Sequence, residues 1–232
     1  MTKASSARRS FLSRWGLGAA SLAAVLPGRT ALAQVKSGAR FEPARHDKDN
    51  WMDELPGKHR LVFDTIHATG LGDALLFGNN FIQANRTDYG LQNSDLAIIV
   101  VMRHLSTVFG FNDAMWNKYG VPMARIAQFT DPETKEAPKS NLFNATGRPQ
   151  LPNFGVTLDA MSKQGVQFAV CSMATRRVAG SIAQAVAGNT DAINTELIAN
   201  LATNAHMVPA GIVAVSRAQE RGYTLVSADR MS

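Results

Sequence analysis

Short apolar runs alternate with amphipathic segments along most of the chain. Five runs are rich in β-branched and aromatic residues, as strands are. They are RLVFDTI (60–66), DLAIIVVM (95–102), VQFAV (166–170), HMV (206–208) and YTLVSA (223–228). The second run is apolar throughout after its first residue, which is typical of a strand buried on both faces of a parallel sheet.

The segments between these runs have the spacing of helices. The predicted helices cover residues 72–85, 112–118, 157–164, 176–187, 191–204 and 209–221. Thr157 is a suitable N-cap, Gly188 and Gly222 end two of the helices, and Pro209 suits the first position of the last one. Strands that alternate with helices predict a single α/β domain, with a five-stranded, mainly parallel sheet flanked by helices.

Two stretches fall outside this alternation. Residues 129–155 contain four prolines and little apolar periodicity, which indicates a long loop or insertion that is either functional or partly disordered. Residues 34–59 are polar and charged, and they predict an N-terminal extension with a local turn around Trp51. The α/β domain is therefore expected over residues 60–232, with the insertion at about 129–155.

Residues 1–33 have the pattern of an export signal. Arg8 and Arg9 precede a short apolar run at residues 15–26, and Ala-Leu-Ala at 31–33 is a cleavage pattern. The Arg-Arg-x-Phe-Leu order resembles a twin-arginine (Tat) signal, with a Sec-type signal as the alternative. The run is shorter than the roughly 18–20 residues that span a membrane. We therefore expect a periplasmic protein, exported by the Tat pathway, with no permanent membrane span after cleavage.

The net charge of +6 depends mostly on this segment. It contains five of the 24 basic residues and no acid, so the remaining chain has 19 basic residues against 18 acids, a net charge of +1. No basic tract remains, and nucleic acid is not an expected partner. The chain has a single cysteine, Cys171, which excludes an internal disulfide.

Cys171 follows the predicted strand 166–170 and precedes the helix that begins near Arg176. In parallel sheets, ligands bind at the carboxyl ends of the strands. The N-terminus of a helix stabilises a thiolate, and Arg176 or Arg177 would add to this effect if either folded back. The alternative is that Cys171 packs as a small buried hydrophobe.

Two histidines also follow predicted strands. His67 and His104 come after the first and second strands, so they are expected at the same sheet edge as Cys171. A Cys/His pair could supply a nucleophile and a base. Together with His206 these side chains could instead bind a metal, although no His-x-x-x-His or Cys-x-x-Cys spacing supports one, and no cofactor is expected. The alternative is that each histidine forms a hydrogen bond within its loop.

Gly-Leu-Gly at 70–72 matches the first two glycines of a dinucleotide-binding loop. The third glycine of such a motif would fall at Leu75, so a tight turn between strand and helix is preferred, in which N–H groups near Gly72 could bind a small anion. The aromatic residues of 109–119 are typical of a core or a subunit interface rather than of cofactor stacking.

Three segments resemble the DsrE/DsrF-like family of sulfur-relay proteins. CSMATRR (171–177) resembles the family's Cys-x-x-Ala-x-x-Arg segment, VPAGIVAVSRAQERGYTLVSA (208–228) its C-terminal helix and strand, and GDALLFGNNFIQA (72–84), more loosely, its opening helix. The resemblance covers residues 60–228, although the insertion at 129–155 has no counterpart. It implies that Cys171 accepts sulfane sulfur as a persulfide and passes it to a partner thiol.

The resemblance also implies partners and assembly. The partners would be sulfur donor and acceptor proteins or small sulfur species. The protein would be a homo-oligomer, a trimer or hexamer, with Cys171 near a subunit boundary. The alternative is a non-catalytic periplasmic ligand-binding or assembly module, which has a buried structural cysteine and uses residues 109–119 and 129–155 to engage its ligand. Whether the protein is an enzyme stays open.

Overall fold

Five strands form one sheet in the computed structural model, which describes residues 42–228. They are β1 (His59–Thr65), β2 (Leu96–Met102), β3 (Gln167–Cys171), β4 (Ala205–Val208) and β5 (Thr224–Ser227). Their order is β4-β3-β2-β1-β5, and every neighbouring pair is parallel. The predicted α/β class with a five-stranded sheet is confirmed. The expected signal at 1–33 and the first part of the extension lie outside the described residues.

The central strand β2 is buried along its whole length. It has a strand on each side and helices over both faces, and this explains why its sequence is a continuous apolar run. Alternate residues of the strand point to opposite faces. Val100 packs into the larger apolar cluster on one face, and Val101 packs into the smaller cluster on the other.

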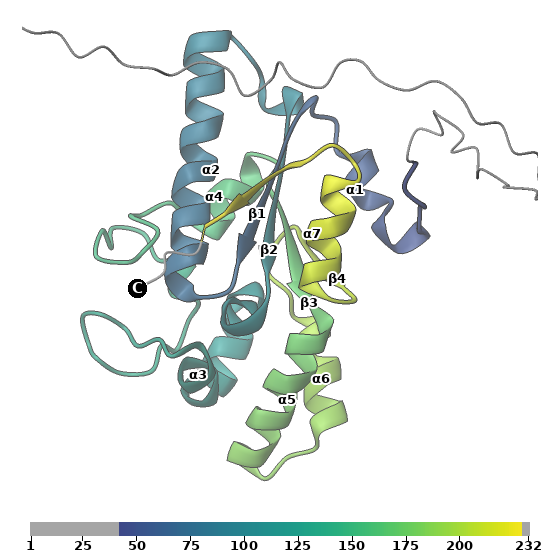
Figure 1. Ribbon diagram of the computed structural model, residues 1–232. Coiled ribbons are helices and arrows are strands. Elements are labelled where there is room, and N and C mark those ends of the chain that lie inside the picture. Colours follow the sequence, from purple (N-terminus) through teal and green to yellow (C-terminus); the bar gives the residue numbers. More distant parts are fainter. Residues whose placement is uncertain (1–41, 229–232) are drawn as a thin grey trace, which may run out of the picture. The chain divides into compact units, whose positions relative to one another are not determined.

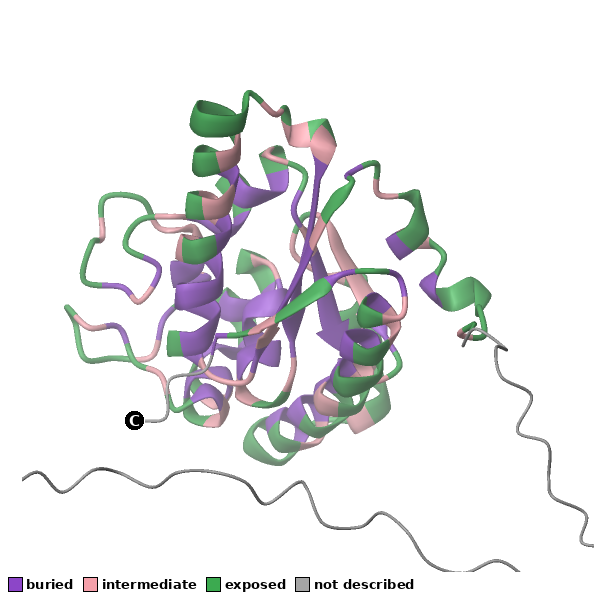
Figure 2. Ribbon diagram, turned by 45° about the horizontal axis from the view of Figure 1, so that its top comes forward, coloured by how far each residue is buried: buried purple, intermediate pink, exposed green. Residues whose placement is uncertain are grey.

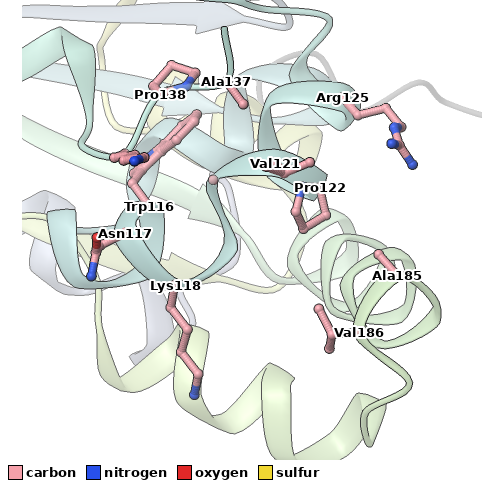
Figure 3. A pocket seen from close by; sticks show the side chains of 12 residues that line it. Trp116, Asn117, Lys118, Val121, Pro122, Arg125, Ala137, Pro138, Ala185 and Val186 are labelled. Carbon is pink, nitrogen blue, oxygen red and sulfur yellow. The ribbon is translucent and has the colours of Figure 1, made fainter.

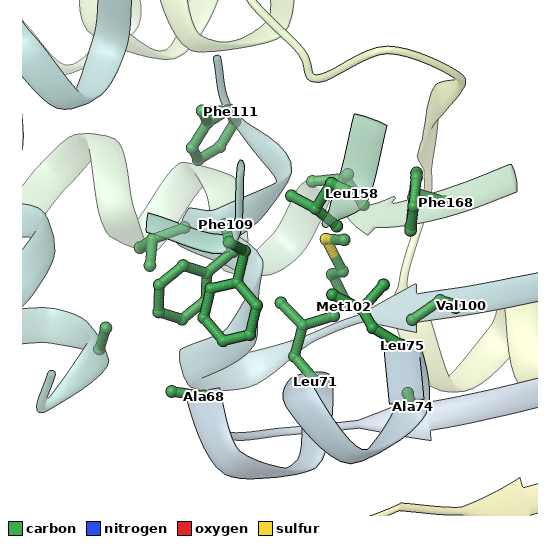
Figure 4. Packing of buried hydrophobic residues seen from close by; sticks show 14 of the residues in the cluster. Ala68, Leu71, Ala74, Leu75, Val100, Met102, Phe109, Phe111, Leu158 and Phe168 are labelled. Atoms are coloured by element: carbon green, nitrogen blue, oxygen red, sulfur yellow. The ribbon is translucent and has the colours of Figure 1, made fainter. Parts of the chain in front are cut away.

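The larger cluster lies between the sheet and most of the helices. These are α2 (Ala68–Tyr89), α3 (Asp113–Ala127), α4 (Leu158–Lys163), α5 (Ser172–Val186) and α6 (Thr190–Ala199). Figure 4 shows Leu71 and Leu75 of α2 beside Met102 and Phe109. The short helix η3 (His104–Gly110), which follows β2, contributes Phe109 to this cluster. The aromatic rings of residues 109–119 are buried within the chain and therefore pack the core.

The opposite face of the sheet is covered by α7 (Gly211–Gln219) and by α1 (Trp51–Glu54), which follows η1 (Asp47–Asp49). Figure 1 shows α7 on the side of the sheet away from α2. Met52 of α1 is fully buried, and its carbonyl accepts hydrogen bonds from Arg60 (3.2 Å) and from the Tyr223 hydroxyl (2.8 Å). The described part of the predicted extension is therefore packed onto the domain.

Residues 129–155 form a long loop with one short helix, η4 (Leu142–Asn144). The loop is held by buried contacts. The Asn141 amide donates to the carbonyls of Phe109 (2.8 Å) and Phe111 (3.0 Å), and Phe143 is fully buried. Figure 2 shows purple, buried positions within the loop as well as in the sheet. The segment is part of the packed structure rather than partly disordered.

Several helix boundaries differ from the predicted ones. Helix α2 begins at Ala68 rather than at Gly72, α5 begins at Ser172 directly after its strand, and α6 ends at Ala199. Helix α3 continues past the predicted end to Ala127, with Pro122 inside it. Tyr119 has non-helical angles (φ −123°, ψ 18°), and this kink relieves the clash that a proline causes inside a regular helix. A further short helix, η2 (Asn93–Asp95), precedes β2.

Candidate functional site

The carboxyl ends of the five strands meet at one edge of the sheet. Cys171 is the last residue of β3 and the N-cap of α5, so strand and helix join with no loop between them. The register pairs Cys171 with Val208 on β4 and Val170 with Met102 on β2. Cys171 is thus at the strand end where a parallel α/β sheet holds its ligands, as the sequence predicted.

The thiol of Cys171 is used as a helix cap. Its Sγ accepts the N–H of Ala174 at 3.4 Å, and the Cys171 carbonyl accepts the Thr175 hydroxyl at 2.9 Å. The first N–H groups of a helix have no partner within the helix and concentrate positive potential. The sulfur of Cys171 therefore lies at the positive end of α5. The residue is only 6% exposed, which limits access to the sulfur.

Strand alternation places the thiol on the α7 side of the sheet. Ala169 and Val208 both belong to the cluster under α7, and Cys171 is two residues beyond Ala169 and paired with Val208. Arg103 directly follows the adjacent strand β2, and its side chain lies against the start of α7. A Cβ on Gly211 would lie 2.5 Å from the Arg103 Cβ, so only glycine allows this approach.

Arg103 forms a two-pronged ion pair with Asp64 of β1. Its Nε and Nη2 lie 2.7 and 2.8 Å from the two carboxylate oxygens of Asp64. Sequence reasoning missed this pair. The signal that could have found it is Asp64 itself, a lone acid inside an otherwise apolar predicted strand, since such a residue needs a buried cationic partner.

The two histidines lie together on the α2 side of the sheet. His67 is the N-cap residue of α2, and its ring is edge-on to that of His104, with 6.3 Å between the ring centroids. His67 also lines a cavity of about 390 Å³, walled by the start of α2, the end of α3 and the loop at Gln150 and Pro152. The two histidine rings therefore lie beside each other, whereas the thiol of Cys171 accepts its hydrogen bond from the Ala174 amide.

His206 lies on β4, paired with Ala169 rather than with Cys171. Its ring stacks on Trp51 with 4.1 Å between centroids, and its Nε2 is 2.9 Å from the Gln167 Oε1. Burial lowers the pKa of His206 below 6.5, and the charge of Glu54 opposes this shift. Within residues 42–228, no group of three or more His, Cys, Asp or Glu side chains is arranged to hold a metal ion.

None of the remaining predicted site residues forms a hydrogen bond with the thiol within residues 42–228. Arg176 pairs with Asp191 of α6 at 3.1 Å, and both side chains are largely exposed, so the pair contributes little. Arg177 is exposed on α5. Gly72 is the fifth residue of α2, where a Cβ would lie 2.5 Å from the Pro152 Cβ. Gly72 therefore packs against the long loop from inside a helix, and the turn predicted at this residue is wrong.

Comparison of the chain with protein-family models, with curated proteins and with solved structures finds no match. Within the part of the chain that the structure describes, none of the helices combines the length and the apolar character that crossing a membrane requires.

Proposed function

We propose that the protein is a sulfur carrier, in which Cys171 accepts sulfane sulfur as a persulfide and transfers it to a partner thiol. The observation that carries this proposal is the position of Sγ at the first turn of α5, 3.4 Å from the Ala174 amide. Both the thiolate and the persulfide anion bear charge on sulfur, and the start of a helix favours that charge. The resemblance of residues 171–177 to the DsrE/DsrF-like segment supports the same role.

The proposed reaction is an exchange that needs no added oxidant. The Cys171 thiolate attacks the terminal sulfur of a donor persulfide, forming an S–S bond as the donor's own S–S bond breaks. The electron pair leaves on the donor thiolate. An acceptor thiolate then attacks the outer sulfur and releases the Cys171 thiolate. Donor and acceptor are sulfur-relay proteins or small sulfur species such as polysulfide.

Mass spectrometry tests the proposal directly. After incubation of the reduced protein with polysulfide, we expect Cys171 to gain the mass of one sulfur atom, and the gain should disappear with dithiothreitol. The matched variant Cys171→Ser keeps an oxygen at the helix cap and should gain nothing. If the wild-type protein stays unmodified while a known persulfide carrier is modified in the same tube, the proposal fails.

A second candidate function is a ligand-binding module with a structural cysteine. The low exposure of Cys171, 6%, favours it, as does the cavity of about 390 Å³ beside His67. The rate of thiol alkylation separates the two functions. Labelling of the folded protein within minutes at neutral pH supports the carrier. Labelling only after unfolding supports the binding module.

The proposal includes export and assembly. It places the mature protein in the periplasm after Tat export, as a trimer or hexamer that covers the Cys171 edge of the sheet. Exposed apolar side chains, such as Met173, two residues after Cys171, are available for such an interface. Sedimentation of the mature protein tests this part, since a monomer at micromolar concentration contradicts it and leaves the sulfur chemistry to be tested separately.

A further inference from the structure

A second cavity, of about 440 Å³, lies between α3, residues 137–139 of the long loop and the last turn of α5. Cys171 caps the opposite end of α5, which is roughly 20 Å long from residue 171 to residue 185 at 1.5 Å per residue. The cavity beside His67 has a different set of lining residues. This cavity is therefore separate from both features described above.

The walls of the cavity are mostly apolar. Trp116 forms one side, Val121 and Pro122 lie at the bend of α3, and Val186 comes from α5, as Figure 3 shows. Val121 is 63% exposed and Val186 is 48% exposed, although both are aliphatic. Aliphatic side chains exposed around a hollow of this size are typical of small-molecule sites.

The shape of the cavity is fixed by a close backbone contact. A Cβ on Gly120 would lie 2.1 Å from the Pro138 carbonyl oxygen, so the loop lies directly against α3 at this point. On the other side, Lys118 and Tyr119 of α3 both bind Glu196 of α6, at 2.6 Å each. A ligand would therefore enter a preformed space and would not have to order these elements.

The polar groups at the rim are predominantly cationic. Lys118, Arg125 and Lys139 line the cavity, and no acidic residue is among its lining residues. Lys118 is neutralised by Glu196. Arg125 and Lys139 are exposed, and neither has an acidic partner within residues 42–228. These two charges attract an anion to an apolar hollow.

Trp116, which lines the cavity, also carries an unsatisfied polar atom. Its indole Nε1–H is buried and has no hydrogen-bond acceptor within the described residues. A buried tryptophan N–H usually has an acceptor.

We propose that this cavity binds a small amphiphilic carboxylate. Its apolar body, an aromatic ring or a short alkyl chain, lies against Trp116, Val121 and Val186. Its carboxylate lies at the rim, beside Arg125 and Lys139. A neutral molecule of the same shape uses only the apolar walls, and a small inorganic anion uses only the rim, so both bind more weakly.

Calorimetric titration of the full chain tests this site with two probes of nearly equal shape. We expect 1-naphthoate to bind at least about tenfold more tightly than the neutral 1-naphthalenemethanol, the preference that a carboxylate should gain from two uncompensated cations. In the Arg125→Gln/Lys139→Gln variant the two probes should bind equally. In Val186→Asp, which places a carboxylate on the apolar wall, neither should bind.

The matched control is Lys58→Gln/Lys163→Gln, which removes the same charge from exposed positions that do not line this cavity. It should keep the preference for the carboxylate, as should Cys171→Ser, because the site does not depend on the thiol. Equal affinity of the wild-type protein for both probes, no binding of 1-naphthoate, or an unchanged preference in the Arg125/Lys139 variant would overturn the proposal.

Discussion

Two junctions between strand and helix lie at the same sheet edge and are built in opposite ways. At the β3–α5 junction the helix starts on the residue after the strand, and the sulfur of Cys171 accepts a first-turn N–H of its own helix. At the β1–α2 junction two residues separate strand and helix, and the N-cap His67 makes no side-chain cap hydrogen bond. This second helix starts beside the cavity of about 390 Å³.

The two junctions therefore differ in how far they are open to a ligand. The β3–α5 junction is closed, since its cap is internal and the thiol is 6% exposed. The β1–α2 junction borders open space, and this suits reversible binding of a larger molecule. The following substitutions test whether the residues named here determine the structure of each junction.

The largest expected effect concerns the glycines inside the two helices. In α2 a Cβ on Gly72 would lie 2.5 Å from both the Pro152 carbonyl carbon and its Cβ, whereas in α5 the nearest atom to a Cβ on Gly180 is 3.9 Å away. We expect Gly72→Ala to lower the free energy of unfolding by about 1–3 kcal/mol through overpacking. Gly180→Ala should raise it by up to about 1 kcal/mol, because alanine favours the helix.

Urea unfolding of the two variants measures this contrast. They carry the same chemical change in the interior of the two helices, so each serves as the control for the other. If Gly72→Ala is as stable as Gly180→Ala, the loop does not press on α2, and the wall of the cavity beside His67 is not rigid.

The next effect concerns the cap of α5. Cys171→Ala leaves the Ala174 N–H without its acceptor, and loss of an N-cap typically costs about 0.5–2 kcal/mol. Cys171→Ser keeps an acceptor oxygen and should be the more stable of the two variants. Thermal unfolding of the reduced proteins decides the matter. Equal stability of the two variants would mean that the sulfur does not act as a cap.

The sequence was sufficient for the strands, for most of the helices and for the place of Cys171 at the end of its strand. Continuous apolar runs predicted the strands because both faces of the sheet are covered, and Thr157 was predicted as a cap and accepts the N–H of Ala160 at 3.1 Å. Cys171 was placed at the end of its strand because its neighbours in sequence change from strand spacing to helix spacing there. Each of these properties depends on residues close in the chain.

The missed features depend on residues distant in the chain. Gly72 was predicted to be part of a turn, yet it lies inside α2, where Pro152, eighty residues later, packs against it. Arg176 was considered as a partner of the thiol, yet it reaches Asp191 once α5 and α6 pack together. The sequence alone did not indicate that Cys171 and the pair of histidines lie on opposite sides of the sheet.

The smallest expected effect is a pH dependence on the β3 side of the sheet. Burial beneath Trp51 lowers the pKa of His206 below 6.5, which is its value in the unfolded chain. Well above pH 6.5 the ring is neutral in both states and the stability is complete. As the pH falls below 6.5 the unfolded chain takes up the proton first, so stability is lost until the pH reaches the lower pKa of the folded protein.

The variant His206→Gln cannot take up this proton and can still form a hydrogen bond with Gln167. We therefore expect the stability of the wild-type protein, relative to this variant, to fall as the pH drops through 6.5 and to level off below the lower pKa of the folded protein. Carboxylates titrate in both proteins, so the difference between the two Tm profiles isolates the histidine. Parallel profiles would show that the Trp51–His206 stack tolerates a charged ring. The packing of α1 against β4 would then be independent of pH in this range.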